Sequence, residues 1–222
     1  MIELPDFAEA FAHENDFYLT CKCNRMSKAL AHYELYKMSL GLPGHIVECG
    51  VFKGVSLVRW AMFRELFENA AARRIIGFDT FGEFPASGYP PDRAKLESWL
   101  SAAGNQSIAR EQLLEVLAHK GITTGIELVK GDVRQTIPEY LERNPGLRIS
   151  LLNLDTDIYE PAVVILEALY ERIVPGGALL LDDYAVFPGE NKAVEEFFAG
   201  RDVRISKLPF SMTPSYLIKK NL

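Results

Sequence analysis

The sequence predicts an α/β fold: a doubly wound, mostly parallel seven-stranded sheet with antiparallel strands at its C-terminal end and added helices at its N-terminus. Two observations support this fold class. Short apolar runs alternate with amphipathic segments, as in parallel sheets that helices cover on both faces. Each of the first five apolar runs also ends in an acidic or glycine-bearing loop, which is typical of the ligand-binding edge of such sheets.

The first 44 residues predict a helical extension. Within residues 24–40 the apolar side chains recur at i, i+3, i+4 and i+7, which is the spacing of one helix face. Asn24 is a suitable N-cap, and the glycines and proline of residues 41–44 end the helix.

The rest of the chain alternates between expected strands and helices. We expect strands at 45–49, 73–79, 126–132, 147–155 and 176–183, and helices at 54–70, 109–120, 159–173 and 191–199. Two further alternating runs, 203–208 and 215–220, predict antiparallel strands.

Residues 84–106 interrupt this alternation. The segment is long and carries its own polar and aromatic residues, so we expect a lid-like insertion that forms a substrate wall. The alternative is a surface insertion that contacts a partner subunit. In either case the 222 residues are expected to form one domain.

Composition excludes several classes of protein. The net charge of −6 argues against a nucleic-acid partner, since phosphate recognition needs a basic surface. No apolar run reaches the roughly 18 residues of a membrane span, and the acidic start lacks the layout of a signal peptide. We therefore expect a cytoplasmic protein without a membrane partner.

The three cysteines fit a reducing compartment. Cys21 and Cys23 could hold a soft metal ion, but no second Cys or His pair lies at zinc-ligand spacing. Cys49 lies within an apolar strand pattern and is expected to be a small buried residue.

The acids at the strand ends are the most informative pattern. Each of them alone is consistent with a turn residue or a helix cap. Together they occupy the same structural position, the carboxyl edge of a parallel sheet, where ligands bind. These acids are Glu48, Asp79, Asp132, Asp155, and Asp182 with Asp183.

The first three strand ends suit a nucleotide-like ligand. Gly50 and Gly54 allow the backbone and a helix N-terminus to approach it, although the dinucleotide pattern GxGxxG is missing and a simple tight turn is the alternative. Asp79 is placed to accept from a ribose diol, or else caps its own turn. Asp132 is placed to accept from an adenine amino group, or else shapes a loop.

The last two strand ends suit a metal ion. Asp155, Asp182 and Asp183 end neighbouring strands, and three carboxylates in one pocket repel unless a cation lies between them. An all-oxygen ligand set favours Mg²⁺. Asp157 is expected to support these ligands or to cap the helix that begins near Pro161.

The motifs IVECGVFKG, IIGFDTFGEFP, LVKGDVRQTIP, LLNLDTDIYEP and PGGALLLDDY, in this order, resemble the macrocin O-methyltransferase family over residues 24–220. The resemblance implies a class I methyltransferase fold (Rossmann-like), S-adenosylmethionine as cofactor, and a sugar or glycoside hydroxyl as acceptor. It implies the same three Mg²⁺ ligands, Asp155, Asp182 and Asp183, and a homodimer or higher homo-oligomer. The cofactor contacts that it implies are Glu48, Gly50, Val51, Phe52, Gly54, Ser56, Asp79, Thr80, Phe81, Gly131, Asp132 and Asp155.

The mechanism expected from this resemblance is in-line transfer of a sulfonium methyl group to a sugar oxygen that Mg²⁺ orients. Asp155 or Asp182 is expected to accept the proton. His32 and His45 are expected to be structural, and no histidine is a clear base. Related phenol-directed enzymes carry a lysine at the position of Ile158, so a lysine-assisted mechanism is not expected.

Four other functions are weaker interpretations. A catechol- or phenol-type O-methyltransferase would use the same metal and hydroxyl chemistry. A phosphohydrolase with a DxD nucleophile usually has Thr or Val where this chain has Tyr159. A DxD glycosyltransferase would leave the glycine loop and the pair Asp182–Asp183 without a role. A binding module that only retains the fold would not need every ligand residue.

Overall fold

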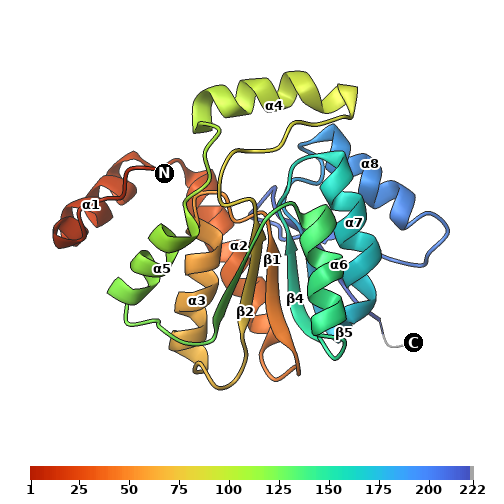
Figure 1. Cartoon of the computed structure of the whole chain (residues 1–222), viewed down its shortest axis with the longest axis horizontal. Coiled ribbons are helices and arrows are strands. Elements are labelled where there is room, and N and C mark those ends of the chain that lie inside the picture. Colours follow the sequence, from red (N-terminus) through yellow and green to blue (C-terminus); the bar gives the residue numbers. More distant parts are fainter. Residues whose placement is uncertain (221–222) are drawn as a thin grey trace.

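The computed structural model describes residues 1–220 and has a central seven-stranded sheet with helices on both faces (Figure 1). The strand order is β3-β2-β1-β4-β5-β7-β6; the first five strands in this order are parallel, and β7 and β6 are antiparallel. The predicted fold class is therefore confirmed. The strands are β1 (His45–Cys49), β2 (Ile75–Asp79), β3 (Ile126–Lys130), β4 (Ile149–Leu154), β5 (Ile173–Leu181), β6 (Ser206–Lys207) and β7 (Ser215–Ile218).

All the predicted helices are present, and two further helices lie where the sequence predicted none. The α-helices are α1 (Ala10–Thr20), α2 (Cys23–Ser39), α3 (Val55–Phe67), α4 (Pro90–Ala103), α5 (Arg110–His119), α6 (Val133–Arg143), α7 (Tyr159–Leu169) and α8 (Pro188–Phe197), with short 3-10 turns at Phe7–Glu9 and Tyr170–Arg172. The unpredicted helices are α4, within the insertion, and α6, whose internal Pro138 removes one backbone donor and so disguises the pattern. None of the helices in residues 1–220 is long and apolar enough to cross a membrane.

Alternate residues of each strand supply two separate apolar layers. Val47 and Cys49 of β1 pack with α6, α7 and α8, whereas Ile46 of the same strand packs with α2, α3 and α5. This period-two alternation buries both faces of the sheet. Cys49 is fully buried, as the sequence predicted.

The chain reverses its direction of travel across the sheet between β1 and β4. From β1 it moves outward to β2 and β3, then returns to β4 on the other side of β1 and continues to β5. In doubly wound sheets such a switch point opens a crevice at the carboxyl ends of the two strands. Figure 1 shows α4 lying across this end of the sheet, whereas α1 projects away from it.

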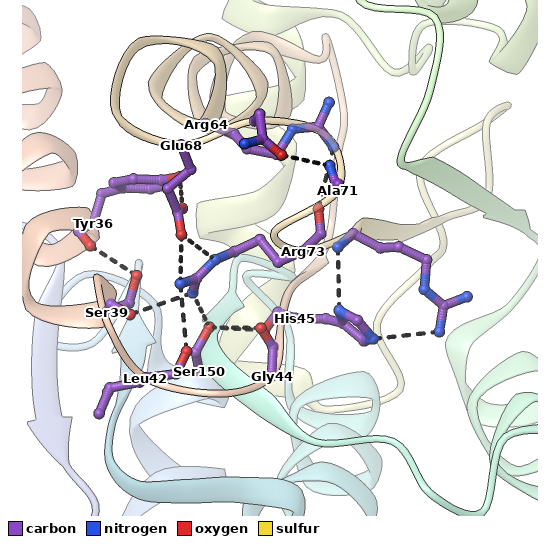
Figure 2. Close-up of polar contacts among 12 residues, drawn as sticks. Tyr36, Ser39, Leu42, Gly44, His45, Arg64, Glu68, Ala71, Arg73 and Ser150 are labelled. Atoms are coloured by element: carbon purple, nitrogen blue, oxygen red, sulfur yellow. Dashed lines mark hydrogen bonds and ion pairs between the residues drawn. The ribbon is translucent and has the colours of Figure 1, made fainter.

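A buried arginine closes the opposite, amino end of the sheet. The Arg73 guanidinium donates to Glu68 Oε1 (2.7 and 3.0 Å), to Ser150 Oγ (2.7 Å) and to the carbonyl oxygens of Ser39 and Leu42 (3.3 and 3.4 Å) (Figure 2). The Tyr36 hydroxyl donates to the other oxygen of Glu68 (2.5 Å). The Arg73 side chain, just before β2, thereby joins the end of α2, the end of α3 and the start of β4.

We predict that Arg73→Met lowers the free energy of unfolding by about 3–5 kcal/mol. The substitution leaves Glu68, whose side chain is only 12% exposed, without its counter-ion, which costs more than the loss of an exposed pair. The measurement is urea unfolding followed by circular dichroism. Arg74→Met is the control, because the Arg74–Glu127 pair is exposed and its loss should cost at most about 1 kcal/mol. Equal losses for the two variants would contradict the assignment.

Candidate functional site

A cavity of about 370 Å³ lies at the carboxyl ends of the strands. Its walls come from the loops that follow β1 to β5, from α2 and from the insertion, and its volume lies within the roughly 300–1,000 Å³ of small-molecule sites. Nine of the twelve expected cofactor residues line it: Gly50, Val51, Phe52, Ser56, Asp79, Thr80, Gly131, Asp132 and Asp155.

Gly50 lies at the switch point, where the loops after β1 and β4 touch. Its backbone has a φ of +93°, and a Cβ atom at this position would lie 1.6 Å from the carbonyl oxygen of Asp155. Only glycine permits this approach. The backbone of the loop expected to hold the cofactor therefore touches the backbone of Asp155, the first expected metal ligand.

Asp79 shapes both neighbouring loops. Its Oδ2 accepts from the backbone N–H groups of Val51 (2.9 Å) and Phe52 (3.0 Å), and its Oδ1 accepts from the N–H of Phe81 (2.6 Å). The turn-capping interpretation of Asp79 is thus confirmed. Because the residue also lines the cavity, its contact with a ribose stays a prediction.

Asp132 is the N-cap of α6. It accepts from the N–H of Arg134 (2.9 Å) and forms an ion pair with the Arg134 guanidinium (2.6 Å), which lowers the pKa of Asp132. The loop-shaping interpretation is again correct. Asp132 and Gly131 both line the cavity, so the expected adenine contact also remains a prediction.

Three of the expected cofactor residues do not line the cavity. Phe81 belongs to the apolar core on the α2–α3–α5 face, and Gly54 is the N-cap of α3 in a left-handed conformation. Glu48 is fully buried behind the cavity, where Asn153 of the paired strand donates to it (2.9 Å). For these three residues the structure shows a role in the core, at a helix start and between two strands, and a cofactor contact stays a prediction.

The carboxylates at the ends of β4 and β5 meet as predicted. Ligand oxygens of Asp155, Asp182 and Asp183 lie within 4.8 Å of one another. One oxygen of Asp182 and one of Asp183 are buried without any hydrogen-bond partner in the described chain. Burial raises the pKa of Asp155 and of Asp183, and the charge of neighbouring carboxylates raises both further. Unpartnered, crowded carboxylate oxygens fit a hard divalent cation.

The sequence did not reveal Lys28, which α2 brings to this cluster. Its ammonium group donates to Asp182 Oδ2. Burial by itself would raise the pKa of Asp182, but Lys28 and His32 outweigh it and hold that pKa below its usual value. A lysine thus reaches the acidic cluster from a helix, although the loop position of the phenol-directed enzymes is the apolar Ile158.

His32 lies one helical turn after Lys28 and faces the same carboxylate. Its Nε2 is 3.7 Å from Asp182 Oδ1, its ring stacks on Trp60 (4.4 Å between centroids), and Arg59 donates to its Nδ1 (2.9 Å). Burial lowers the pKa of His32 to about 4, so the ring is neutral near pH 7 and carries its proton on Nε2. At 3.7 Å the two atoms face each other without a hydrogen bond, so His32 lies beside the cluster, and the expectation that it is structural stays a prediction. A Lys and a His four residues apart on an amphipathic helix are the signal that could have marked the site.

Asp157 does not cap α7, so that interpretation is wrong. The N-cap of α7 is Ile158, without a side-chain capping bond, and the N–H of Tyr159 donates to Asp92 instead. Asp157 is buried beside the cluster in a left-handed conformation (φ +61°), and burial together with the charge of Asp155 raises its pKa. An acid shortly before a helix can cap it only when the backbone of the loop directs its side chain to the first N–H groups, and here the left-handed backbone of Asp157 directs it elsewhere.

The insertion supplies an aromatic wall. Trp99 of α4 packs on Phe52 (4.8 Å between centroids) and on Phe84 (5.5 Å), and all three line the cavity. Lys53, from the loop after β1, donates to the carbonyl oxygen of Gln106 and so joins this loop to the end of the insertion. The segment expected to be a substrate wall therefore borders the cavity.

Comparisons with known proteins agree with this geometry. A family model described as macrocin O-methyltransferase (TylF) matches residues 23–209. A solved structure of the calicheamicin methyltransferase CalS11 is 31% identical, superposes with a TM-score of 0.78, and is matched over 97% of this chain and 87% of that one. An apo structure of CalS11, described as a TDP-rhamnose 3'-O-methyltransferase, is 33% identical with a TM-score of 0.69, over 96% and 87% of the two chains.

Among curated proteins, a 4'-O-methyltransferase of Streptomyces olivaceus that acts on a rhamnosyl tetracenomycin is 30% identical over 149 residues. The match covers 66% of this chain and 55% of the relative. A mycinamicin III 3''-O-methyltransferase of Micromonospora griseorubida is 24% identical, over 71% of this chain and 61% of the relative. This chain thus spans little more than half the length of these curated relatives.

We predict that Glu48→Gln removes a pH dependence of stability. Burial raises the pKa of Glu48 to about 7, above the roughly 4.3 of an unfolded chain. The stability that this raised pKa contributes is fully present below pH ~4.3 and is lost as the pH rises through 7. The share of Glu48 in the loss of stability should be on the order of 3 kcal/mol between these pH values, in addition to the share of the other buried carboxylates with raised pKa values.

The measurement is the free energy of unfolding from pH 4.5 to 8 in the absence of metal. Glu48→Gln, which keeps the shape and the oxygen that accepts from Asn153, should make this part of the profile less steep by the share of Glu48. The exposed Glu97→Gln is the control and should leave it unchanged. Parallel profiles for wild type and Glu48→Gln would contradict the raised pKa.

Proposed function

Because the chain belongs to the macrocin O-methyltransferase family, we propose that it transfers the methyl group of S-adenosylmethionine to a hydroxyl of a sugar, in a Mg²⁺-dependent reaction. The single observation that carries the proposal is the meeting of two half-sites at one switch point. The glycine loop and Asp79 lie on one side, and the cluster of Asp155, Asp182 and Asp183 lies on the other. The printed names of the relatives, which describe methylation of sugars on natural products, support the acceptor class.

Three groups of residues around the cavity would have three different roles. When bound, S-adenosylmethionine supplies a methyl group on a positively charged sulfur, and Mg²⁺ supplies a Lewis acid that lowers the pKa of a nearby hydroxyl. The glycine loop and the strand-end acids would hold the cofactor, and Asp155, Asp182 and Asp183 would hold the cation. The aromatic wall of Phe52, Phe84 and Trp99 borders the cavity and would exclude water from it.

Asp155 is the better candidate for the proton acceptor. Lys28 and His32 keep the pKa of Asp182 low, which makes this carboxylate a weak base. Without a bound cation, burial and the charge of Asp182 raise the pKa of Asp155, which makes it the more basic of the two carboxylates. Asp155 would take the proton that the acceptor hydroxyl gives up when its oxygen receives the methyl group, which the cofactor would supply by releasing its sulfur–carbon bond.

The experiment that tests the proposal is a methyl-transfer screen over nucleotide-linked sugars, glycosides and catechols, with and without Mg²⁺. Methylation of a sugar that EDTA abolishes and Mg²⁺ restores is the expected result. Methylation of catechols alone would favour the phenol-type enzyme. Calorimetry without detectable binding of S-adenosylmethionine or S-adenosylhomocysteine would refute the cofactor assignment.

We predict that Asp155→Asn lowers kcat by about 10²–10⁴-fold, the usual contribution of a general base. The change in the dissociation constant for S-adenosylhomocysteine should be small, because the amide keeps the loop geometry next to Gly50. Rates are measured at saturating cofactor, and binding by calorimetry. Asp202→Asn, at an exposed position far from the cavity lining, is the control. A kcat of Asp155→Asn close to that of the wild type would exclude Asp155 as the base.

We also predict that Asp182→Asn abolishes Mg²⁺-dependent activity while the protein remains folded. The amide loses one anionic ligand oxygen and the charge that pairs with Lys28. Activity is assayed over a Mg²⁺ titration, and folding by circular dichroism. Full activity of this variant in the presence of EDTA would refute the metal site.

A further inference from the structure

One buried carboxylate, Asp92, has no role in the function proposed above. It lies in the first turn of α4, within the insertion, and is fully buried. Its Oδ2 accepts from the N–H of Tyr159 (3.1 Å) and from the hydroxyl of Ser87 (3.1 Å). Its Oδ1 accepts from the N–H of Gly189 (2.6 Å). Both oxygens are thus committed to donors from other parts of the chain.

The two backbone donors belong to the first turns of α7 and α8. Helix N-termini expose N–H groups that a side chain at the N-cap usually satisfies. Here the N-caps are Ile158 and Phe187, whose side chains have no oxygen. Asp92 supplies the missing acceptor to both helices, and its charge is stabilised by both helix dipoles.

The surrounding packing is built around this arrangement. A Cβ atom on Gly189 would lie 2.1 Å from Asp92 Oδ2 and 2.5 Å from the backbone nitrogen of Tyr159, so only glycine fits there. Leu96, one turn further along α4, packs with Ile158 and Phe187 in a small apolar cluster. The insertion therefore holds both helix starts by a polar and an apolar contact.

These helix starts end the two loops that carry the metal carboxylates. Asp155 lies in the loop between β4 and α7, and Asp182 and Asp183 lie in the loop between β5 and α8. We propose that Asp92 is a positioning residue that fixes the spacing of these two loops, which makes the insertion part of the frame of the carboxylate cluster. The consequence for Mg²⁺ rests on the proposed function; the consequence for the loops does not.

The chemistry of the carboxylate predicts the effect of its loss. Asparagine has one acceptor oxygen, so in Asp92→Asn either Tyr159 or Gly189 must face an NH₂ group and lose its bond. A donor left unpaired at a buried helix N-terminus destabilises that end of the helix. The loop before it should then open more often, and the carboxylates should lose their fixed separation.

The test compares wild type, Asp92→Asn and two controls by hydrogen exchange and by calorimetry with Mg²⁺. In Asp92→Asn, the amides of residues 156–162 and 184–192 should exchange at least about tenfold faster, whereas those of 126–130 should not change. The dissociation constant for Mg²⁺ should rise by about 10–100-fold, as for other residues that orient metal ligands. The constant for S-adenosylhomocysteine should change much less.

The controls separate positioning from general stability. Glu97→Gln removes an exposed carboxylate from the same helix and should match the wild type. Ile137→Val, on the buried face of α6, should lower stability by about 0.5–1.5 kcal/mol and leave the affinity for Mg²⁺ unchanged.

Unchanged exchange of both loops in Asp92→Asn would overturn the proposal, and so would an unchanged affinity for Mg²⁺ where the wild type binds the ion. A wild type that binds no Mg²⁺ would refute the proposed metal chemistry alone. The exchange data would then still decide whether Asp92 holds the two loops.

Discussion

The mutual repulsion of buried and half-buried carboxylates at one edge of the sheet is the constraint on which the arrangement of the site depends. Parallel strands bring their carboxyl ends together, so the acids that follow β4 and β5 meet whether or not their charges are compensated. Lys28 compensates only Asp182 directly. Asp155 and Asp183 keep raised pKa values, and this imbalance is the electrostatic argument for the proposed cation site.

Charged groups at the two ends of the sheet differ in how many of their hydrogen-bond partners the chain supplies. At the amino end, Arg73 finds a carboxylate, a hydroxyl and two carbonyl oxygens as acceptors, and Figure 2 shows how closely these partners surround it. At the carboxyl end, oxygens of Asp182 and Asp183 remain without partners among the described residues. A buried charge with all its hydrogen-bond partners stabilises the fold, whereas buried oxygens without partners indicate a place for a ligand.

Local patterns explain why much of the fold and the acidic cluster could be predicted. The strand His45–Cys49 coincides with its predicted range, because an apolar run between two glycine-containing turns has few alternatives. Once the parallel order was inferred, the strand-end acids Asp155, Asp182 and Asp183 had to meet. The helix α6 was missed because Pro138 contradicts a helix locally, while burial of Ile137 and Tyr140 outweighs that cost.

The residues that escaped prediction act over long separations in the chain. Lys28 meets Asp182 across 154 residues, and Asp92 meets Tyr159 and Gly189 across 67 and 97 residues. In the sequence, Asp92 follows two prolines within an insertion where no helix was predicted, so nothing marked it as a helix-capping acid. No periodicity indicates its contact with two other helices.

The capping of α7 and α8 by Asp92 limits which sequence changes the insertion can accept. A helix with its own N-cap can keep its start when a neighbouring segment changes. The starts of α7 and α8 instead depend on a carboxylate from the insertion, the same segment that supplies Trp99 to the cavity wall. Changes in the insertion that reshape the wall must therefore preserve the position of Asp92, or they also alter the spacing of the carboxylates.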